Sequence, residues 1–324
     1  MVTSRELPLV SIIITSYNRG SLISKAIQSS LSQEYSNLEI VISDNCSTDD
    51  SDRVISQFLQ DSRIRYFRND TNIGMLANFD RATNLSKGQY LTYVSSDDYL
   101  VNSRFISEAV QLIQENQNIV AVYEKEQILD SGTRKIVAVN KCSYYDRRVI
   151  PGIEVFKLFP TVGGLSFGAC LMEKTGLLEA NIYQQAGIFK DCEASLKFCM
   201  MGDIGFIDKI AYTVLAHGTN TSQTLTTSEQ YLQKIIDCAV KPYTYAKQRK
   251  KLDGKELEDW RMMSVLRDIK SGLRKLYRQP NREFDIFLEQ AGKDYPEVIR
   301  KLKRSGKWTL FLWLAPYYRK LFVL

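Results

Sequence analysis

Histidine is almost absent from this chain, since His217 is the only one among 324 residues. The six cysteines are scattered and none belongs to a Cys-x-x-Cys pair, which argues against a structural zinc site. Scattered cysteines are typical of reduced thiols, and the first apolar run is typical of a core strand rather than of a secretory leader. We therefore expect a cytoplasmic protein.

Long apolar runs are also lacking. A membrane-spanning helix needs about 18 or more consecutive apolar residues, and no stretch reaches that length. The nearest candidate extends from Trp308 to Leu314 and is followed by Ala315 and Pro316. We therefore expect no spanning helix.

Apolar residues form two kinds of pattern in the first hundred residues. Continuous apolar runs indicate strands buried on both faces, and apolar residues at helical spacing between them indicate helices. This alternation predicts an α/β fold with a mostly parallel sheet flanked by helices. The predicted strands are Val10 to Thr15, Leu38 to Ile42, Ile64 to Phe67 and Tyr90 to Val94, and the predicted helices are Ser21 to Gln33, Asp49 to Gln60 and Gly74 to Ser86.

The rest of the chain divides into a mixed and a helical part. Residues 119–216 hold further strand-like runs and a glycine cluster at Gly163, Gly164 and Gly168. From Glu229 onward the pattern is helical. One apolar stripe at helical spacing consists of Leu266, Ile269, Leu273 and Leu276.

Polar side chains follow three of the predicted strands. In parallel sheets, ligands bind beyond the carboxyl ends of the strands, so we expect a ligand site at this edge. The polar residues are Thr15, Ser16, Tyr17, Asn18 and Arg19 after the first strand, Ser43, Asp44 and Asn45 after the second, and Ser95, Ser96, Asp97 and Asp98 after the fourth.

Two carboxylates stand side by side at this edge, Asp97 and Asp98. Their repulsion is relieved beside a divalent cation, and Mg²⁺ and Mn²⁺ commonly join one or two carboxylates to phosphates. A solvated turn or a helix cap is the alternative. Asp44 can accept hydrogen bonds from a bound ribose or form an Asx-turn, and Tyr17 can stack on a base or pack beside its strand.

Four segments in this part of the chain carry a family resemblance. The segment VSIIITSYNR at residues 10–19 resembles the opening strand of family 2 glycosyltransferases, and the resemblance continues through IVISDNCSTD at 40–49, NIG at 72–74 and GQYLTYVSSDD at 88–98. A weaker match runs to about His217. The resemblance implies a GT-A fold, a nucleotide diphosphate sugar as donor, and inversion at the transferred sugar.

The resemblance also implies roles for single residues. Asp97 corresponds to the carboxylate that binds a metal, Mn²⁺ or Mg²⁺, on the diphosphate. His217 lies where some members place a histidine near that metal, and a structural role is its alternative. Asp191 resembles the family's catalytic base, and a helix cap is its alternative. The expected substrate-binding residues are Thr15, Tyr17, Asn18, Arg19, Asp44, Asn72, Ser95, Ser96 and Asp98.

Two positions depart from the family pattern. The metal loop often reads Asp-x-Asp-Asp, but Ser95 stands in place of its first acid. Because the missing acid usually contacts the ribose, the resemblance does not indicate which nucleotide the protein uses. The base motif is usually Glu-Asp, but Lys190 precedes Asp191.

The implied reaction needs charge neutralisation and a base. A metal at Asp97 neutralises the leaving diphosphate, and Asp191 deprotonates the acceptor hydroxyl on the opposite face of the sugar. The expected acceptor is a glycan, more specifically a lipid-linked intermediate of cell-surface polysaccharide synthesis. A non-catalytic nucleotide-binding scaffold is the alternative. A dinucleotide-binding dehydrogenase is disfavoured because SYNRGS at residues 16–21 does not supply GxGxxG.

The expected domains are a catalytic domain at residues 1–225 and a basic helical extension at 226–324. In the first, residues 1–100 form the nucleotide-sugar half and 101–225 the acceptor half. The loop from Gly163 to Gly168 and the helix at Asp191 are expected to shape the acceptor pocket.

Acidic residues are scarce in the extension. From Lys241 to the end, 21 lysines and arginines stand against 10 acidic residues. The basic residues Lys301, Lys303, Arg304 and Lys307 adjoin the apolar run that starts at Trp308, which suits a helix lying on the anionic inner face of a membrane. Packing on the catalytic body or on a second copy in a homo-oligomer is the alternative. Nucleic-acid binding is not expected, because no recognition motif accompanies the charge.

Overall fold

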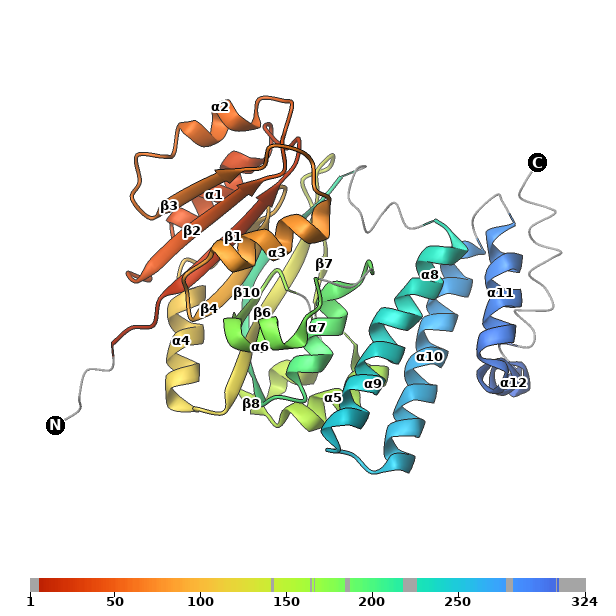
Figure 1. The fold of residues 1–324 in the computed structure, drawn as a ribbon. Coiled ribbons are helices and arrows are strands. Elements are labelled where there is room, and N and C mark those ends of the chain that lie inside the picture. The colour runs from red at the N-terminus through yellow and green to blue at the C-terminus, as the bar shows by residue number, and fades with distance from the viewer. Residues whose placement is uncertain are drawn as a thin grey trace. The chain divides into compact units, whose positions relative to one another are not determined.

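The computed structural model describes residues 6–140, 143–163, 165, 167–183, 187–217, 226–277, 282–306 and 308 (Figure 1). The chain divides into two compact units. The first unit consists of residues 1–156, 164–186 and 198–217, and the second of residues 157–163, 187–197 and 218–324. The two units interleave along the chain, and the division into domains at residue 225 stays a prediction.

The first unit contains a ten-stranded sheet in the order β3-β2-β1-β4-β9-β6-β10-β5, with β7 beside β6 and β8 beside β10. The first four strands in this order are parallel, as predicted, whereas β9 runs antiparallel to both of its neighbours. The strands are β1 Val10–Ser16, β2 Leu38–Asp44, β3 Ile64–Arg68, β4 Tyr90–Ser95, β5 Tyr99–Leu100, β6 Ile119–Asp130, β7 Ile136–Val139, β8 Val149–Ile150, β9 Cys170–Glu173 and β10 Asp203–Ala216.

Register aligns the strand ends that hold the polar loops. Thr15 of β1 lies opposite Ser43 of β2 and Ser95 of β4. The apolar residues of these strands are buried, and β1 and β2 are covered on both faces, which is why they read as continuous apolar runs. The three predicted polar loops therefore start from one edge of the sheet.

Helices of the first unit cover the sheet. Residues of α1 and α4, among them Ile27 and Phe105, pack with Ile12 and Ile14 of β1 in one core. The predicted helix at residues 49–60 is shorter than expected, because the amides of Gln57 and Phe58 bond carbonyls three residues back and end the α-helix. The helices are α1 Ile23–Leu31, α2 Ser51–Ser56, α3 Met75–Leu85, α4 Phe105–Glu115, a 3₁₀ turn Ser143–Asp146 and α6 Lys174–Ala180.

The second unit is helical. Ile269, Leu273 and Leu276 of the predicted stripe are buried in its core with Phe284 and Phe287. Two helices contain residues of both units, α5 Gly152–Val162 and α7 Lys190–Phe198. The others are α8 Ser228–Ile235, a π-helical segment Ile236–Val240, α9 Lys241–Arg249, α10 Gly254–Leu276, α11 Glu283–Asp294 and α12 Pro296–Arg304.

The expected interfacial segment is described only in part. Trp308 is buried in the core of the second unit, where Lys270 and Arg274 lie over its ring. Trp308 therefore packs within the helical part of the chain itself, and both the membrane-surface role and the alternative of packing on the catalytic body or on a second copy stay predictions. Lys307 and residues 309–324 lie outside the described residues. Among the described helices, none has the length and apolar content needed to cross a membrane.

Glu124 of β6 is a buried carboxyl group in the first unit. The side-chain amide of Asn102 donates to its Oε2 at 3.0 Å, and its Oε1 has no hydrogen-bond partner among the described residues. Burial raises the pKa of Glu124 to about 8, and the nearby Glu108 adds to the rise. The folded protein therefore keeps this carboxyl protonated at pH values where the unfolded chain ionises it.

This shift predicts a pH dependence of stability. Between about pH 4.5 and 8 the folded state binds more protons than the unfolded state at this site, so the free energy of unfolding falls as pH rises. We expect Glu124→Gln to remove up to about 4 kcal/mol of that fall, measured by urea unfolding from pH 5 to 8. Glu6→Gln, which changes an exposed residue, is the control. Equal slopes in both variants would contradict the prediction.

Candidate active site

The loops after β1 and β2 are joined by hydrogen bonds. The amide of Asn18 donates to Ser47 Oγ at 2.8 Å, and Asn18 Oδ1 accepts from the amide of Thr48 at 2.8 Å. Asn18 has a φ of 51°, in the left-handed region that asparagine tolerates. Gly20 follows closely, and a Cβ there would lie 2.8 Å from the amide nitrogen of Ser51. These contacts fix both loops at the carboxyl edge of the sheet.

Asp44 ends β2 and is fully buried. Its carboxylate accepts from the amide of Ser47 at 3.0 Å, from the Ser47 hydroxyl, and from Arg68 Nε at 3.3 Å. Arg68 Nη2 also donates to the carbonyl oxygen of Ser47 at 2.6 Å. The Asp44 carboxylate thus bonds a local amide, three residues on rather than the two of an Asx-turn, and also lies at the ligand edge. As a substrate-binding residue Asp44 stays a prediction, since here it orders Ser47 and Arg68.

Three buried asparagines, Asn45, Asn69 and Asn78, and the exposed Asn72 support the same edge. Asn45 Nδ2 donates to Asn72 Oδ1 at 2.8 Å, and Asn69 Nδ2 donates to Asn45 Oδ1 at 2.9 Å. Asn78 of α3 bonds Ser43 through both its amide oxygen and its amide nitrogen. The Asn72 side-chain oxygen accepts from Asn45 and from the amide of Gly74, and the exposed Asn72 stays a prediction as a substrate contact.

Asp97 and His217 meet at this edge although 120 residues separate them. His217 Nε2 lies 3.0 Å from Asp97 Oδ2, and Arg19 Nε lies 3.7 Å from the same oxygen. Both side chains of the first pair are partly exposed, at 15% and 16%. The fold thus joins a residue after β1, one after β4 and one after β10, all within the first unit.

Asp98 is turned inward, unlike Asp97. Tyr212 donates its hydroxyl to Asp98 Oδ2 at 3.0 Å, and the amide of Leu215 donates to Asp98 Oδ1 at 2.8 Å. Burial raises the pKa of Asp98 to about 7, and the neighbouring Asp97 adds to the rise. Because Leu215 is two residues from His217, Asp98 holds the end of β10 where His217 reaches Asp97.

The remaining predicted contacts line the same edge. Tyr17 is 44% exposed, so its ring is free to meet a ligand. Thr15 and Ser95 are half-buried, and Ser96 is buried. The amide of Ser95 donates to the Tyr212 hydroxyl at 3.0 Å. The first unit therefore brings together all the predicted substrate and metal residues.

His217 Nε2 and Asp97 Oδ2 are hydrogen-bonded to each other, and their spacing also suits two ligands of one divalent cation. Two neighbouring ligands of an octahedral ion bound at about 2.1 Å are about 3 Å apart, which is the separation of these two atoms. Asp98 is a poor ligand because both of its oxygens are already hydrogen-bonded inside the protein. Within the part of the chain that the structure describes, no group of three or more His, Cys, Asp or Glu could hold a metal. An ion at this site would need further ligands, and phosphate oxygens supply them in many Mg²⁺ sites.

Asp191 lies in the second unit, on the first turn of α7. Its side chain is reached by solvent, and its Oδ1 accepts from the amide of Cys192 at 2.8 Å. The protein packed around it raises the pKa of its carboxyl, and Asp237 contributes to the rise. Because it belongs to the other unit, its relation to Asp97 stays a prediction.

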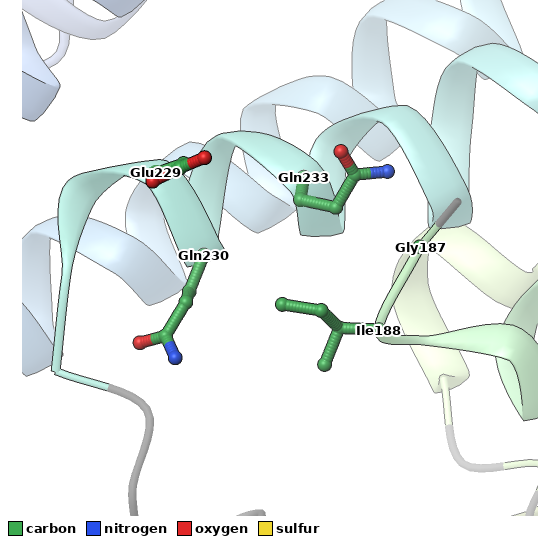
Figure 2. A pocket seen from close by; sticks show the side chains of 5 residues that line it. All are labelled: Gly187, Ile188, Glu229, Gln230 and Gln233. Atoms are coloured by element: carbon green, nitrogen blue, oxygen red, sulfur yellow. The ribbon is translucent and has the colours of Figure 1, made fainter. Parts of the chain in front are cut away.

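A pocket of about 340 Å³ opens beside this segment (Figure 2). Figure 2 shows Ile188 facing the side chains of Gln230 and Gln233 from α8. Glu229 and Gly187 complete the described lining. The pocket combines an apolar side chain, two amides and a carboxylate, and Ile188 is three residues from Asp191.

Sequence reasoning missed several residues of this site. Arg68 is the last residue of β3 and Asn69 follows it, and the end of this strand was not considered among the strand-end loops. Applying the same rule to the third predicted strand would have found both. Tyr212 gave no such signal, because its role depends on β10 running beside β5.

A family model matches the part of the chain that holds most of this site. The model described as Glycosyl transferase family 2 matches residues 11–177. That range covers more than half of the chain and includes all the site residues of β1 to β4.

Curated relatives match in the same region. The chain is 39% identical over 100 residues to the Escherichia coli protein named UDP-Glc:alpha-D-GlcNAc-diphosphoundecaprenol beta-1,3-glucosyltransferase WfaP, covering 31% of this chain and 39% of that protein. It is 39% identical over 112 residues to a putative colanic acid biosynthesis glycosyl transferase, WcaA, of E. coli K12, covering 33% and 39%. The matches thus span about two fifths of the length of these relatives.

Solved structures extend the likeness to most of the chain. Residues 1–349 of S. aureus TarS in complex with UDP-GlcNAc align with a TM-score of 0.66 at 16% identity, covering 87% of this chain and 80% of that one. The mannosyltransferase PcManGT from Pyrobaculum calidifontis, in complex with GDP-Man and Mn²⁺, aligns with a TM-score of 0.54 at 15% identity, covering 97% and 85%. These likenesses show the fold, which is of the predicted GT-A type.

Proposed function

The chain belongs to glycosyl transferase family 2, and on that premise we propose that it transfers a sugar, with inversion, from a nucleotide diphosphate sugar to an acceptor hydroxyl. The observation that carries this proposal is the Asp97–His217 pair at the carboxyl edge of the parallel strands. Arg19 beside Asp97 and Arg68 beside Asp44 add positive charge at the edge where a diphosphate would bind.

The donor occupies the first unit in this proposal. Tyr17 offers an exposed ring for the base, and Thr15 and Ser95 offer hydroxyls at aligned strand ends. Asn18 and Arg19 follow Tyr17 on the same loop. A UDP-sugar is the favoured donor, because WfaP is named for UDP-Glc and TarS is solved with UDP-GlcNAc.

Asp97 and His217 would hold a divalent ion, Mn²⁺ or Mg²⁺. When bound, such an ion neutralises charge that develops on the leaving diphosphate. Asp97 would supply the anionic ligand, and His217 would supply its Nε2 atom. Asp98 keeps His217 in place through the amide of Leu215.

Asp191 is the proposed base. A carboxylate that removes the acceptor's proton works best when its pKa lies closer to neutral, and the pKa of Asp191 is raised in this direction. The pocket beside Ile188 offers amides and a carboxylate to acceptor hydroxyls (Figure 2). Residues 1–225 then form the catalytic domain, and residues 226–324 form an extension that helps to bind the acceptor.

The proposed acceptor is a glycan, more narrowly a lipid-linked intermediate of cell-surface polysaccharide synthesis. The name of WfaP specifies a diphosphoundecaprenol-linked acceptor, and the name of WcaA specifies colanic acid biosynthesis. Lys301, Lys303 and Arg304 of α12 give the extension a basic helix that could rest on an anionic membrane surface. We place the protein on the cytoplasmic side of that membrane.

The donor assignment is tested by ligand-dependent melting. A ligand that binds only the folded state at 100 times its dissociation constant adds about 2.7 kcal/mol. We expect UDP, UDP-glucose or UDP-N-acetylglucosamine with Mn²⁺ to raise the melting temperature by a few degrees, and Mn²⁺ alone to raise it less. GDP-mannose is the comparison ligand. If no nucleotide diphosphate raises the melting temperature, the donor site is misassigned.

Turnover separates an enzyme from a scaffold. With a nucleotide sugar that binds and polyprenyl-diphosphate N-acetylglucosamine as acceptor, an enzyme releases the nucleoside diphosphate and a non-catalytic scaffold does not. Binding without release, across this donor set and a panel of glycan acceptors, would favour the scaffold.

A further inference from the structure

Asp237 is a fully buried carboxylate beneath the segment that carries Asp191. Its Oδ2 accepts from the amides of Ile188 at 2.8 Å and Phe189 at 3.1 Å. Its Oδ1 accepts from Gln233 Nε2 at 3.0 Å and Lys241 Nζ at 2.8 Å. We call these five residues the Asp237 cluster. All of them belong to the second unit, as does Asp191.

Gly187 allows the segment to approach this carboxylate. A Cβ at Gly187 would lie 2.6 Å from each oxygen of Asp237, closer than real Cβ contacts come. Figure 2 shows Gly187 and Ile188 passing beside the helix that carries Gln233. Any side chain at Gly187 would therefore push the segment away from Asp237.

The Asp237 cluster is tied to α7 itself by further charges. Lys241 Nζ also lies 3.5 Å from Glu193 Oε2, and Glu193 is fully buried. Lys190 and Lys197 pair with Glu193 at 3.0 and 2.7 Å. Lys190, which replaces the family's first acid, is thus part of the buried charge network that holds α7.

The backbone around Asp237 is unusual. Residues 236–240 form a π-helical segment between α8 and α9, and such segments are often found at functional sites. Asp237 is its second residue. A carboxylate that only caps a helix or forms a surface ion pair is not usually fully buried with four hydrogen bonds. Two of the four bonds of Asp237 hold main-chain amides within three residues of Asp191.

We propose that Asp237 is a positioning residue that fixes the main chain before Asp191 and so aims the Asp191 carboxylate at the acceptor hydroxyl. The inference rests on the proposed function in one respect, that Asp191 is the base. Asp237 itself does not touch substrate in this scheme. Its effect is on the turnover number, because the misplaced base is still chemically intact.

The first test needs no activity. In Asp237→Asn, one of the two carboxylate oxygens becomes an NH₂ group that faces donors in either orientation, so two of the four hydrogen bonds are lost. We expect amide hydrogen exchange at Ile188 and Phe189 to accelerate by about tenfold or more in the intact protein. Asp268→Asn is the matched control, because Asp268 is buried and ion-paired to Arg267 in the same unit. Equal exchange in both variants overturns the anchoring.

The second test measures rate. For release of UDP from the UDP-sugar that the wild type consumes, we expect Asp237→Asn to lower kcat by about tenfold or more with the donor KM unchanged. Gly187→Ala should do the same without changing any charge. If both variants exchange these amides faster but keep the wild-type kcat, Asp237 does not position the base. An inactive wild type instead refutes the proposed function, while hydrogen exchange still decides the anchoring.

The pH profile separates positioning from a loss of folded protein. The charged groups that act on the Asp191 carboxyl in this unit are Asp237, which raises its pKa, and Lys234, which lowers it, while Lys190 and Glu193 pair with each other. Asp237→Asn should move the acid limb of the kcat profile to lower pH, and Asp259→Asn, which changes an exposed aspartate on α10, should leave it in place. An unmoved limb in Asp237→Asn contradicts the contact between the two charges.

Discussion

Asp97→Asn is expected to lower the kcat for sugar transfer by about 10²- to 10³-fold, the usual loss when one group that stabilises transition-state charge is removed. Asparagine keeps the size of the side chain and removes its charge. His217 Nε2 and Arg19 Nε then face a neutral amide in place of a carboxylate oxygen. The measurement is the initial rate of nucleoside diphosphate release at saturating donor and Mn²⁺.

A second readout follows the cation rather than the rate. If Asp97 and His217 share the ion, Asp97→Asn should shift the Mn²⁺ concentration needed for half of the melting-temperature rise upward by about tenfold or more. Asp61→Asn is the matched control, because Asp61 is also partly exposed and ion-paired to an arginine, Arg63, at 2.9 Å. Wild-type rates and an unchanged Mn²⁺ response in Asp97→Asn would remove Asp97 from the site.

Local sequence pattern was enough to predict the four parallel strands of the sheet. Buried parallel strands leave a continuous apolar run, and β1, β2 and β4 begin at the predicted residues. The mixed region was harder because antiparallel β9 and the long β10 gain their hydrogen bonds from strands far away in sequence. No local period encodes that Leu171 pairs with Val122.

The site divides in the same way. The adjacency of Asp97 and Asp98 was visible, but their opposite orientations were not, because Asp98 turns inward toward Tyr212 and Leu215 of β10. The contact of His217 with Asp97 came from family resemblance and could not come from spacing across 120 residues. From the sequence, Lys190 was only a departure from the base motif. In the structure it forms a buried ion pair with Glu193.

Asp191→Asn is expected to lower kcat by about 10²- to 10⁴-fold, which is the range for loss of a general base. Asparagine cannot take a proton from the acceptor hydroxyl, although it still accepts the hydrogen bond that the Asp191 carboxylate receives from Cys192. Donor binding should be unchanged, because the predicted donor and metal residues all lie in the first unit and Asp191 lies in the second. The measurements are kcat and the melting-temperature rise caused by the nucleotide sugar.

A lower kcat with unchanged donor binding distinguishes Asp191→Asn from Asp97→Asn, which is also expected to weaken the response to Mn²⁺. Asp259→Asn, an exposed aspartate on α10 of the same unit, is the control and should keep full activity. If Asp191→Asn retains wild-type turnover, another group takes the proton. The proposal that Asp237 positions the catalytic base is then wrong as well. If it loses turnover together with donor binding, Asp191 supports the donor site, and the base must be sought among other carboxylates such as Glu229 at the pocket.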